Sequence, residues 1–419
     1  MAGIDGRTTE GKTEADQLLE VLFGGVEQDP FPYYDALREL GDGIHPMDMM
    51  QGVLVTRYDH IRQIGSDPKA FSSDVFALTG PGIHDPTDPE HRRFIGTARR
   101  LFMFADPPWH TQVRSTFRHA FTPDAVRRWH PIVEEITSEA LACLQPGQEI
   151  DLMSGLAAEI PVAVIARILG VPRDTWPYFR EWSFAYASTF DPMVQGERRD
   201  RAIRTSLVLF DYLGELIDQR RAQPSDDLIS HMLSTETFQG DLLENSDLIA
   251  QVALLLVAGN ETTTNLVGNG VTLLMNHPDA MRAVLDDPSL IPAVVEEILR
   301  FDPPLHLAAR KVTTDAVLGE HVLQPGTLVL TCLPAANRDP RVFDAASAFD
   351  IHRADHKQHL AFFHGIHYCV GAPLARLEGK VILDRLLRAF PDLREGSQPP
   401  VRRTLNVASR GWESRPVIL

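Results

Sequence analysis

Apolar residues recur at helical spacing along most of the chain, and strand-like patterns are confined to a few short stretches. The pattern over 123–234 is mostly helical and begins with Thr122-Pro123-Asp124, a typical helix start with threonine as the cap and proline in the first turn. The same spacing predicts helices over 291–301 and 372–390. Helices therefore dominate the predicted structure.

One predicted helix is unusually long. Its pattern continues from Ser246, which we expect to be the N-cap, to the stop signal at Asn276-His277-Pro278. Roughly thirty residues at ~1.5 Å each extend over about 45 Å, whereas an ordinary helix has about 11 residues. A helix of this length crosses a whole domain.

Short stretches bounded by turn residues predict small β-sheets. Strand signals occur at 52–56, 312–313, 321–322 and 327–331. Residues 80–90 are rich in Gly, Pro, Asp and Thr, which predicts a long loop. The expected fold class is therefore mainly α with small β-sheets.

The chain shows no internal boundary. No repeat and no Gly/Ser-rich or Pro-rich linker divides it, so we expect residues 17–419 to form a single large domain. Residues 1–16 are polar and rich in Gly and Thr, and we expect them to be a disordered tail. The longest strongly apolar stretch, 252–258, is far below the ~20 residues of a spanning helix, so we expect no membrane anchor.

Charge and cysteine content narrow the functional classes. The 419 residues include 40 Lys and Arg and 57 Asp and Glu, which gives a formal net charge of −17. This charge argues against nucleic acid as the main partner, since phosphate binding needs a basic face. Three widely spaced cysteines, Cys143, Cys332 and Cys369, are no disulfide framework, so we expect a reducing, cytoplasmic location.

The segment 362–376 holds the strongest chemical signal. Cys369 lies in a loop bracketed by Gly365 and Gly371, directly before a predicted helix. The glycines permit tight turns and a close approach of the backbone to a ligand. Free N–H groups at the start of a helix favour a thiolate over a thiol. Cys369 is therefore placed to be an anionic sulfur ligand.

The residues alone leave three interpretations of this loop open. Cys369 could be a small buried cysteine before a helix. It could bind zinc with His364 and His367, although structural zinc usually takes four ligands and no second pair has suitable spacing. It could also be the axial thiolate of haem iron.

The same segment resembles the haem-binding loop of the cytochrome P450 family, F-G-x-G-x-H-x-C-x-G. The matching positions are Phe362, Gly365, His367, Cys369 and Gly371. The sequence departs from the family at Phe363, where the family usually has Gly, and we expect an altered turn under the haem. By resemblance, Cys369 is the axial iron ligand and His367 pairs with a haem propionate.

The long helix carries a polar cluster, Gly259-Asn260-Glu261-Thr262, after an apolar run. The cluster could be a turn that faces solvent, or its threonines could bond back to helix carbonyls. With Ala258 before it, the cluster also resembles the family's oxygen-activation motif, A-G-x-E/D-T. The resemblance implies that Ala258 and Gly259 contact the haem, that the helix widens locally, and that Glu261 and Thr262 relay protons.

An E-x-x-R pair lies on the helix predicted over 291–301. Glu297 and Arg300 share one helix face, and Arg310 follows at the family's spacing. By resemblance, the pair is structural and supports the haem loop, and Arg310 binds a propionate. Ala348 stands where some relatives carry the arginine of this ion-pair triad, so the sequence names no third partner.

A further segment, 106–114, resembles the family's D-P-P-x-H-x-x-x-R helix start. Its His110 and Arg114 are four residues apart, so they lie on one helix face, and two such groups suit a carboxylate. By resemblance, they bind haem. The alternative is an ordinary amphipathic helix with an exposed histidine and arginine.

The resemblance implies a cytochrome P450 fold, in which a long central helix lies over the haem. It also implies a monooxygenase that inserts one oxygen atom from dioxygen into a small lipophilic molecule of secondary metabolism, by hydroxylation or epoxidation. The cofactor would be haem b, and NAD(P)H would act indirectly through a separate ferredoxin or flavodoxin with its reductase. The alternatives are a peroxide-driven haem enzyme and a non-catalytic haem-binding protein. We expect a monomer.

The substrate contacts are the least specific expectation. By resemblance, they come from the helices near the haem and from the segment after the E-x-x-R helix. The candidates are Phe184, Val257, His306 and Leu307. A structural role for His306, with its ring nitrogens bonded inside the fold, is equally consistent with the sequence.

Overall fold

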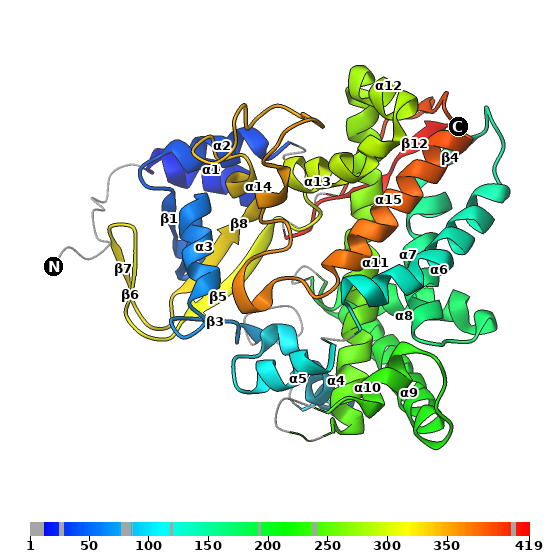
Figure 1. Cartoon of the computed structure of the whole chain (residues 1–419). Helices are drawn as coiled ribbons and strands as arrows, with labels where there is room; N and C mark the ends of the chain where they lie inside the picture. Colours follow the sequence, from blue (N-terminus) through cyan, green and yellow to red (C-terminus); the bar gives the residue numbers. More distant parts are fainter. Residues whose placement is uncertain are drawn as a thin grey trace. The chain divides into compact units, whose positions relative to one another are not determined.

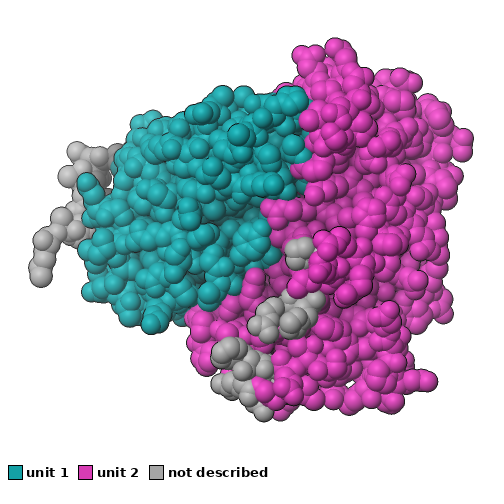
Figure 2. Space-filling view, viewed as in Figure 1, with its two compact units in different colours: residues 1–73, 293–369, 402–411 teal, residues 74–292, 370–401, 412–419 magenta. Residues whose placement is uncertain are grey.

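The computed structural model describes residues 12–24, 29–76, 85, 87–117, 120–191, 194–236, 240, 242–403 and 408–419. The chain divides into two compact units, which Figure 2 colours teal and magenta. Unit 1 comprises Met1–Ser73, Ala293–Cys369 and Arg402–Gly411, and unit 2 comprises Asp74–Pro292, Val370–Val401 and Trp412–Leu419. The expectation that residues 17–419 fold as one domain stays a prediction.

Unit 1 is built around a five-stranded sheet with the order β1-β2-β8-β5-β3. Its strands are β1 (Ile44–Met47), β2 (Gly52–Val55), β8 (Leu328–Cys332), β5 (Leu307–Val312) and β3 (Phe71–Ser72). Strand β2 runs parallel to β8, and the other neighbours are antiparallel. The hairpin of β6 (Ala316–Leu318) and β7 (His321–Leu323) follows β5.

The described part of unit 1 also contains five α-helices, which Figure 1 shows together with this sheet. They are α1 (Glu14–Phe23), α2 (Phe31–Glu39), α3 (Tyr58–Ser66), α13 (Ile291–Phe301) and α14 (Leu333–Asn337). The apolar core joins sheet residues such as Val53 and Val329 to Ile61 of α3 and to Phe363 of the cysteine loop. The loop that carries Cys369 is thus anchored in the same core as the sheet.

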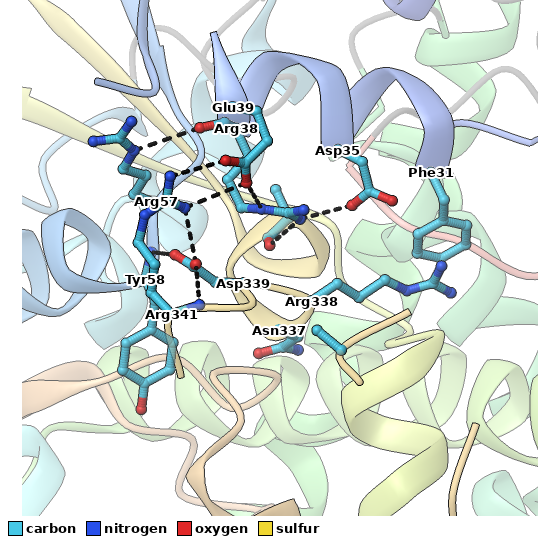
Figure 3. A network of polar contacts seen from close by, with 12 residues as sticks. Phe31, Asp35, Arg38, Glu39, Arg57, Tyr58, Asn337, Arg338, Asp339 and Arg341 are labelled. Carbon is cyan, nitrogen blue, oxygen red and sulfur yellow. Dashed lines mark hydrogen bonds and ion pairs between the residues drawn. The ribbon is translucent and has the colours of Figure 1, made fainter. Parts of the chain in front are cut away.

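Polar contacts tie the chain after α14 to the first helices of unit 1 (Figure 3). Arg341 pairs with Glu39 of α2 at 2.9 Å and with Asp339 at 3.0 Å. The other carboxylate oxygen of Asp339 accepts a bond of 3.2 Å from the backbone N–H of Tyr58, at the start of α3. The buried Arg38 donates 3.0 Å to the carbonyl of Ala335 in α14.

Unit 2 is mainly helical. Its helices are α4 (Pro89–Ala98), α5 (Trp109–Phe117), α6 (Pro123–Ala142), α7 (Glu159–Ile168), α8 (Trp176–Ser188), α9 (Glu197–Ala222), α10 (Leu228–Ser234), α11 (Asn245–Asn276), α12 (Pro278–Asp286) and α15 (Ala372–Ala389). A three-stranded sheet has the order β4 (Glu149–Asp151), β12 (Pro416–Ile418) and β9 (Arg394–Glu395). Two further short strands are β10 (Val401–Arg402) and β11 (Trp412–Ser414).

Helix α11 runs the length of unit 2 beside α15 (Figure 1). Its 32 residues confirm the predicted long helix. The N-cap is Glu244, however, and Ser246 lies inside the first turn, so the prediction of Ser246 as the cap was wrong. The chain enters the helix two residues earlier, because the extended backbone conformation of an N-cap occurs at Glu244.

The strand predicted at 312–313 was misplaced, because β5 spans Leu307–Val312 and begins five residues earlier. Several other element bounds follow the sequence pattern. Thr122 caps α6 by accepting a bond from the backbone N–H of Ala125, as predicted. Helix α1 begins at Glu14, inside the segment expected to be a tail, because Thr13 and Asp16 form a capping box. Residues 1–11 of that tail, and most of the loop predicted over 80–90, lie outside the described residues. Among the described helices, none combines the length and apolar character that a membrane crossing requires.

Candidate active site

The cysteine loop of unit 1 is closed by backbone hydrogen bonds. The N–H of Cys369 donates to the carbonyl of Phe362 at 3.0 Å, and the N–H of Tyr368 donates to Gly365 at 3.0 Å. The turn between them is the short helix η9 (Gly365–His367). Cys369 is exposed, so the alternative of a small buried cysteine does not describe it. The loop therefore holds an exposed Cys369 on a fixed backbone.

Two glycines let this loop lie directly on α3. A Cβ at Gly365, which has a φ of +72°, would overlap the carbonyl oxygen of Gly65. A Cβ at Gly65 would lie 3.0 Å from the carbonyl oxygen of His364. The two backbones are thus in contact, and this explains why Gly365 has no side chain. Sequence reasoning missed Gly65, because its partner is 300 positions away.

Phe363, where the family usually has Gly, adopts a left-handed backbone conformation with a φ of +59°. Its side chain is only 7% exposed and belongs to the apolar core of unit 1. The guanidinium of Arg310 lies over its ring, with the central carbon 4.3 Å from the ring centroid. Phe363 therefore adopts a backbone conformation that is unusual for a non-glycine residue. It also places a buried ring next to Arg310, the residue predicted to bind a haem propionate.

His367 and Arg310 have defined positions in unit 1. The Nε2 atom of His367 lies 2.8 Å from the hydroxyl of Ser73, at hydrogen-bonding distance. Arg310 is 8% exposed and pairs with Val329 in the β5–β8 ladder. Its Nη1 donates 2.6 Å to the carbonyl of Ala309. Unit 1 thus brings Cys369, His367 and Arg310 together around one loop and one sheet.

Glu297 and Arg300 form the predicted ion pair, and both side chains are fully buried. The pair is bidentate: Nε and Nη2 of Arg300 donate to the two carboxylate oxygens of Glu297 at 2.8 and 2.7 Å. Arg300 also donates to the carbonyls of Asn337, Ala346 and Ala348 at 2.7–2.9 Å. The pair therefore fixes the chain after α14.

The third partner of this pair is Arg353, whose Nε lies 3.0 Å from Glu297. The sequence did not predict Arg353, because the family pattern places this arginine at position 348. Ala348 takes part through its backbone carbonyl, which accepts bonds from Arg300 and Arg353 at 2.7 and 3.3 Å. The one available signal was an arginine five residues beyond the expected position.

In unit 2, the middle of α11 differs from the rest of that helix. Its flanking stretches are almost wholly buried, whereas Val257, Ala258, Gly259, Glu261 and Thr262 are partly or fully exposed. A Cβ at Gly259 would meet no atom within 4 Å. Thr262 and Glu261 thus border open space in the middle of a buried helix, where a bound group could reach them.

Thr262 bonds back into the helix, as one of the sequence alternatives proposed. Its hydroxyl donates to the carbonyl of Ala258 at 2.7 Å. Such back-bonding is typical of threonine inside helices and often bends them. Helix α11 nevertheless continues without interruption from Asn245 to Asn276. The bond and the proton relay are compatible, because a hydroxyl can rotate between acceptors.

Buried polar contacts also hold this part of α11 against neighbouring helices. Asn260 donates to the hydroxyl of Ser183 in α8 at 3.1 Å, and the hydroxyl of Thr263 donates to Glu378 in α15 at 3.4 Å. Burial raises the pKa of Glu378 to about 8, and the bond from Thr263 lowers it only in part. Sequence reasoning missed Glu378, since nothing local shows that a charged residue of the last helix faces inward.

His110 and Arg114 lie on α5 in unit 2, as predicted. His110 is only 2% exposed, and its ring centroid lies 6.0 Å from that of Phe102. Arg114 is partly exposed. An exposed histidine was part of the alternative interpretation of this helix, and the burial of His110 contradicts it.

The substrate candidates lie in different surroundings. Phe184 is 40% exposed on α8 and has the guanidinium of Arg180 over its ring at 5.8 Å. Val257 is partly exposed on α11. Leu307 is 8% exposed at the start of β5. Only Val257 shares an element with the predicted relay residues.

His306 is held inside unit 1. Its Nδ1 lies 2.9 Å from the hydroxyl of Tyr34, and its Nε2 lies 4.0 Å from Asp302. Burial lowers its pKa to about 3, and the neighbouring Arg410 lowers it further than Asp302 raises it. This geometry favours the structural alternative for His306 over a substrate contact.

The described side chains also bear on the zinc alternative. Within the described ranges, no three His, Cys, Asp or Glu side chains gather closely enough to hold a metal ion. His364, His367 and Cys369 are near in sequence, but they are not among any such group. A zinc centre built on these three residues therefore has no geometric support.

Comparison with known proteins identifies the family. The model of the family described as "Cytochrome P450" matches residues 183–409. The chain is 38% identical over 378 residues to Cytochrome P450 107B1 of Saccharopolyspora erythraea, covering 89% of this chain and 91% of that protein. It is 35% identical over 370 residues to Mycinamicin IV hydroxylase/epoxidase of Micromonospora griseorubida, covering 87% and 89%.

The solved structures agree with this assignment. Ligand-free CYP164A2 of Mycobacterium smegmatis matches with a TM-score of 0.83 and 33% identity, covering 97% of this chain and all of that chain. The predicted fold class, mainly helical with small sheets, is confirmed. The chain belongs to the cytochrome P450 family and is an oxidoreductase, a monooxygenase whose family uses haem iron and dioxygen.

Proposed function

We propose that this enzyme inserts one oxygen atom from dioxygen into a lipophilic small molecule, by hydroxylation or epoxidation in secondary metabolism. The similarity to a Mycinamicin IV hydroxylase/epoxidase supports both the reaction type and the metabolic setting. The relay residues on α11 favour the dioxygen route over a peroxide-driven one, which needs no proton delivery.

The exposed thiol of Cys369 is the observation that carries the proposal. It lies on a loop closed by two backbone hydrogen bonds, three residues before the first residue of α15. The helix start offers N–H groups that stabilise a thiolate. Haem bound through this sulfur supplies an iron centre whose thiolate ligand favours cleavage of the O–O bond.

The remaining haem contacts are assigned by chemistry. In unit 1, Arg310 and His367 would donate hydrogen bonds to haem carboxylates, and in unit 2, His110 and Arg114 would do the same. Close approach of the haem to the backbone is assigned to positions with little or no side chain, namely Ala258, Gly259 and Gly371. In unit 1 the exposure of Cys369 leaves this residue accessible to a ligand, and in unit 2 the open space at Gly259 would allow a ligand to approach the backbone of α11.

Protons would travel through Glu261 and Thr262. Glu261 is partly exposed, so its carboxyl group can exchange protons with water. Thr262 would give up its bond to the carbonyl of Ala258, accept a proton from Glu261, and donate its own hydroxyl proton into the open space beside this stretch of α11. The two residues together would deliver the protons that oxygen cleavage consumes.

Substrate would be held mainly by apolar contacts. Val257 lies on α11 four residues before Glu261 and five before Thr262, and Phe184 and Leu307 are the other apolar candidates. We retain His306 only as the weakest of the four, because its ring is already bonded to Tyr34. Apolar contacts suit a lipophilic molecule, whose transfer out of water they favour.

Electrons would come from a separate ferredoxin or flavodoxin, reduced by NAD(P)H through its reductase. The exposed arginines Arg127 and Arg128 on α6 have the charge that suits an acidic partner. A cytosolic location and a monomeric state stay predictions.

The optical spectrum of the reduced protein under carbon monoxide tests this proposal. We expect a strongly red-shifted Soret band in the natural protein, and its loss in Cys369→Ser. Cys143→Ser is the matched control, because Cys143 is also exposed but lies at the end of α6. A red-shifted band that persists in Cys369→Ser would overturn the ligand assignment, and a protein that binds no haem would overturn the function.

A further inference from the structure

Phe363 occupies a backbone conformation that disfavours any side chain. Its φ of +59° lies in the left-handed region, where a non-glycine residue costs about 1–2 kcal/mol. Glycine is the usual residue at such positions, because it has no Cβ to clash with the carbonyl. A phenylalanine that is retained there needs a compensating interaction.

The ring of Phe363 has two sets of neighbours in unit 1. It is 7% exposed in the core that includes Val329 and Leu360, and it lies under the guanidinium of Arg310. The distance of 4.3 Å from the guanidinium carbon to the ring centroid is well within the ~6 Å of a cation–π contact. Of the described cation–π contacts, this is among the closer ones, and it is formed where water is largely excluded.

The orientation of this contact matters for Arg310. A guanidinium is planar, and its N–H donors lie in the plane while its face is apolar. The ring contacts the centre of the guanidinium, and at the rim Nη1 already donates to the carbonyl of Ala309. The β5–β8 ladder fixes the backbone of Arg310. The contact with Phe363 restrains the guanidinium, so both the backbone and the end of the side chain are held in place.

We propose that Phe363 is a positioning residue that holds the guanidinium of Arg310 in place to bind a haem carboxylate. This inference rests on the proposed function, which assigns Arg310 to that carboxylate. The benefit that offsets the strained backbone is then a more rigid Arg310 side chain at the haem carboxylate. Less side-chain freedom is lost when haem binds, because the arginine is already ordered.

The rate at which the haem-loaded protein releases haem to an excess of apomyoglobin tests the proposal. Phe363→Leu keeps an apolar side chain but removes the aromatic ring, and Phe363→Tyr keeps the ring. We expect Phe363→Leu to release haem between about twofold and thirtyfold faster, the range of a partly to fully desolvated cation–π contact. Phe363→Tyr should restore the natural rate within about twofold.

A double-mutant cycle shows whether the two residues act together. Arg310→Gln should accelerate release, and Phe363→Leu in that background should add no further acceleration. Leu318→Ala, in the same apolar core but on β6, controls for general loosening of unit 1. Urea unfolding of each variant without haem shows how much stability each change removes.

The outcomes are distinct. Release from Phe363→Leu that is no faster than from Leu318→Ala, or effects of Phe363→Leu and Arg310→Gln that multiply in the double variant, would overturn the positioning role. An Arg310→Gln variant that keeps haem like the natural protein would overturn the assignment of Arg310 itself. In that case the carbon monoxide spectrum still tests Cys369, so the two failures can be told apart.

Discussion

The guanidinium of Arg353 lies 3.0 Å from the carboxylate of Glu297, and so completes the buried group that Glu297 forms with Arg300. Arg353 also donates to the carbonyl of Asp344 and pairs with Asp355, both at 3.0 Å. These bonds tie the segment 344–355 to α13. Replacing Arg353 therefore disturbs both a charge balance and a set of backbone acceptors.

We expect Arg353→Ala to lower the free energy of unfolding by about 3 kcal/mol, as is typical when a buried ion pair loses one partner. Arg388→Ala is the control, because its pair with Asp384 is on the surface and should contribute less than about 1 kcal/mol. Urea unfolding of both variants measures the difference. Equal losses in the two variants would show that Arg353 acts only as a surface charge.

Glu378 should make stability depend on pH. Burial raises its pKa to about 8, so between about pH 4.5 and 8 the folded protein holds a proton that the unfolded chain has released. Stability should therefore fall as the pH rises through this window, by up to about 1.4 kcal/mol per unit. Glu378→Gln should remove this slope, whereas the exposed Glu135→Gln should keep it. Thermal unfolding at several pH values distinguishes the two.

His306 should have its effect on the acid side. Burial lowers its pKa to about 3. Between about pH 6.5 and 3, His306 is therefore protonated in the unfolded chain but neutral in the folded protein. Stability should thus decline as the pH falls through this range. His306→Gln should flatten the decline, and His352→Gln, at an exposed site, should leave it unchanged. An unchanged acid slope in His306→Gln would argue that His306 is accessible and available to substrate.

Gly365 and Gly147 separate two effects of adding a methyl group. Both have positive φ, +72° and +79°, but only at Gly365 would the new Cβ overlap another backbone, that of Gly65. Gly147→Ala should cost about 1–2 kcal/mol from conformation alone. Gly365→Ala should cost more and should also weaken the red-shifted carbon monoxide band. Similar melting temperatures for the two variants would show that α3 shifts to make room for the added Cβ at little cost.

Thr262 should control how electrons are used. Thr262→Ala removes the hydroxyl, and we expect product formation to fall toward the lower end of the about 10²–10⁴-fold range of acid–base catalysis. Hydrogen peroxide should appear in place of the missing product. Thr262→Ser, which keeps the hydroxyl, should retain most of the coupling. Product, peroxide and NAD(P)H consumed are measured together on a substrate found by screening. Full coupling in Thr262→Ala would mean that water or the substrate delivers the proton.

The parts of this fold that depend on neighbours in sequence could be predicted. The bounds of α13 and α15, the cap at Thr122 and the Glu297–Arg300 pair follow from spacing over a few residues. The cap of α11 was misplaced by two residues, because both Ser246 and Glu244 precede the apolar pattern. Local chemistry therefore gives the elements well and their ends less well.

The parts that depend on distant residues could not be predicted. The contact of Gly65 with the cysteine loop, the bond between Ser73 and His367, and the bond between Thr263 and Glu378 join positions that are 115 or more residues apart. No periodicity in the sequence encodes such pairs. Phe363 is an intermediate case, since the motif marked the position as unusual but only the structure shows Arg310 over its ring.

The parallel pairing of β2 with β8 has a consequence for synthesis on the ribosome. About 270 residues separate the two strands, and at about 5–20 residues per second the ribosome needs roughly 15–50 s to supply the second strand. Until then β2 can pair only with β1, and its other edge is open to strands of other chains. Slower translation between the two strands would therefore lengthen the period in which this unpaired edge can pair with other chains.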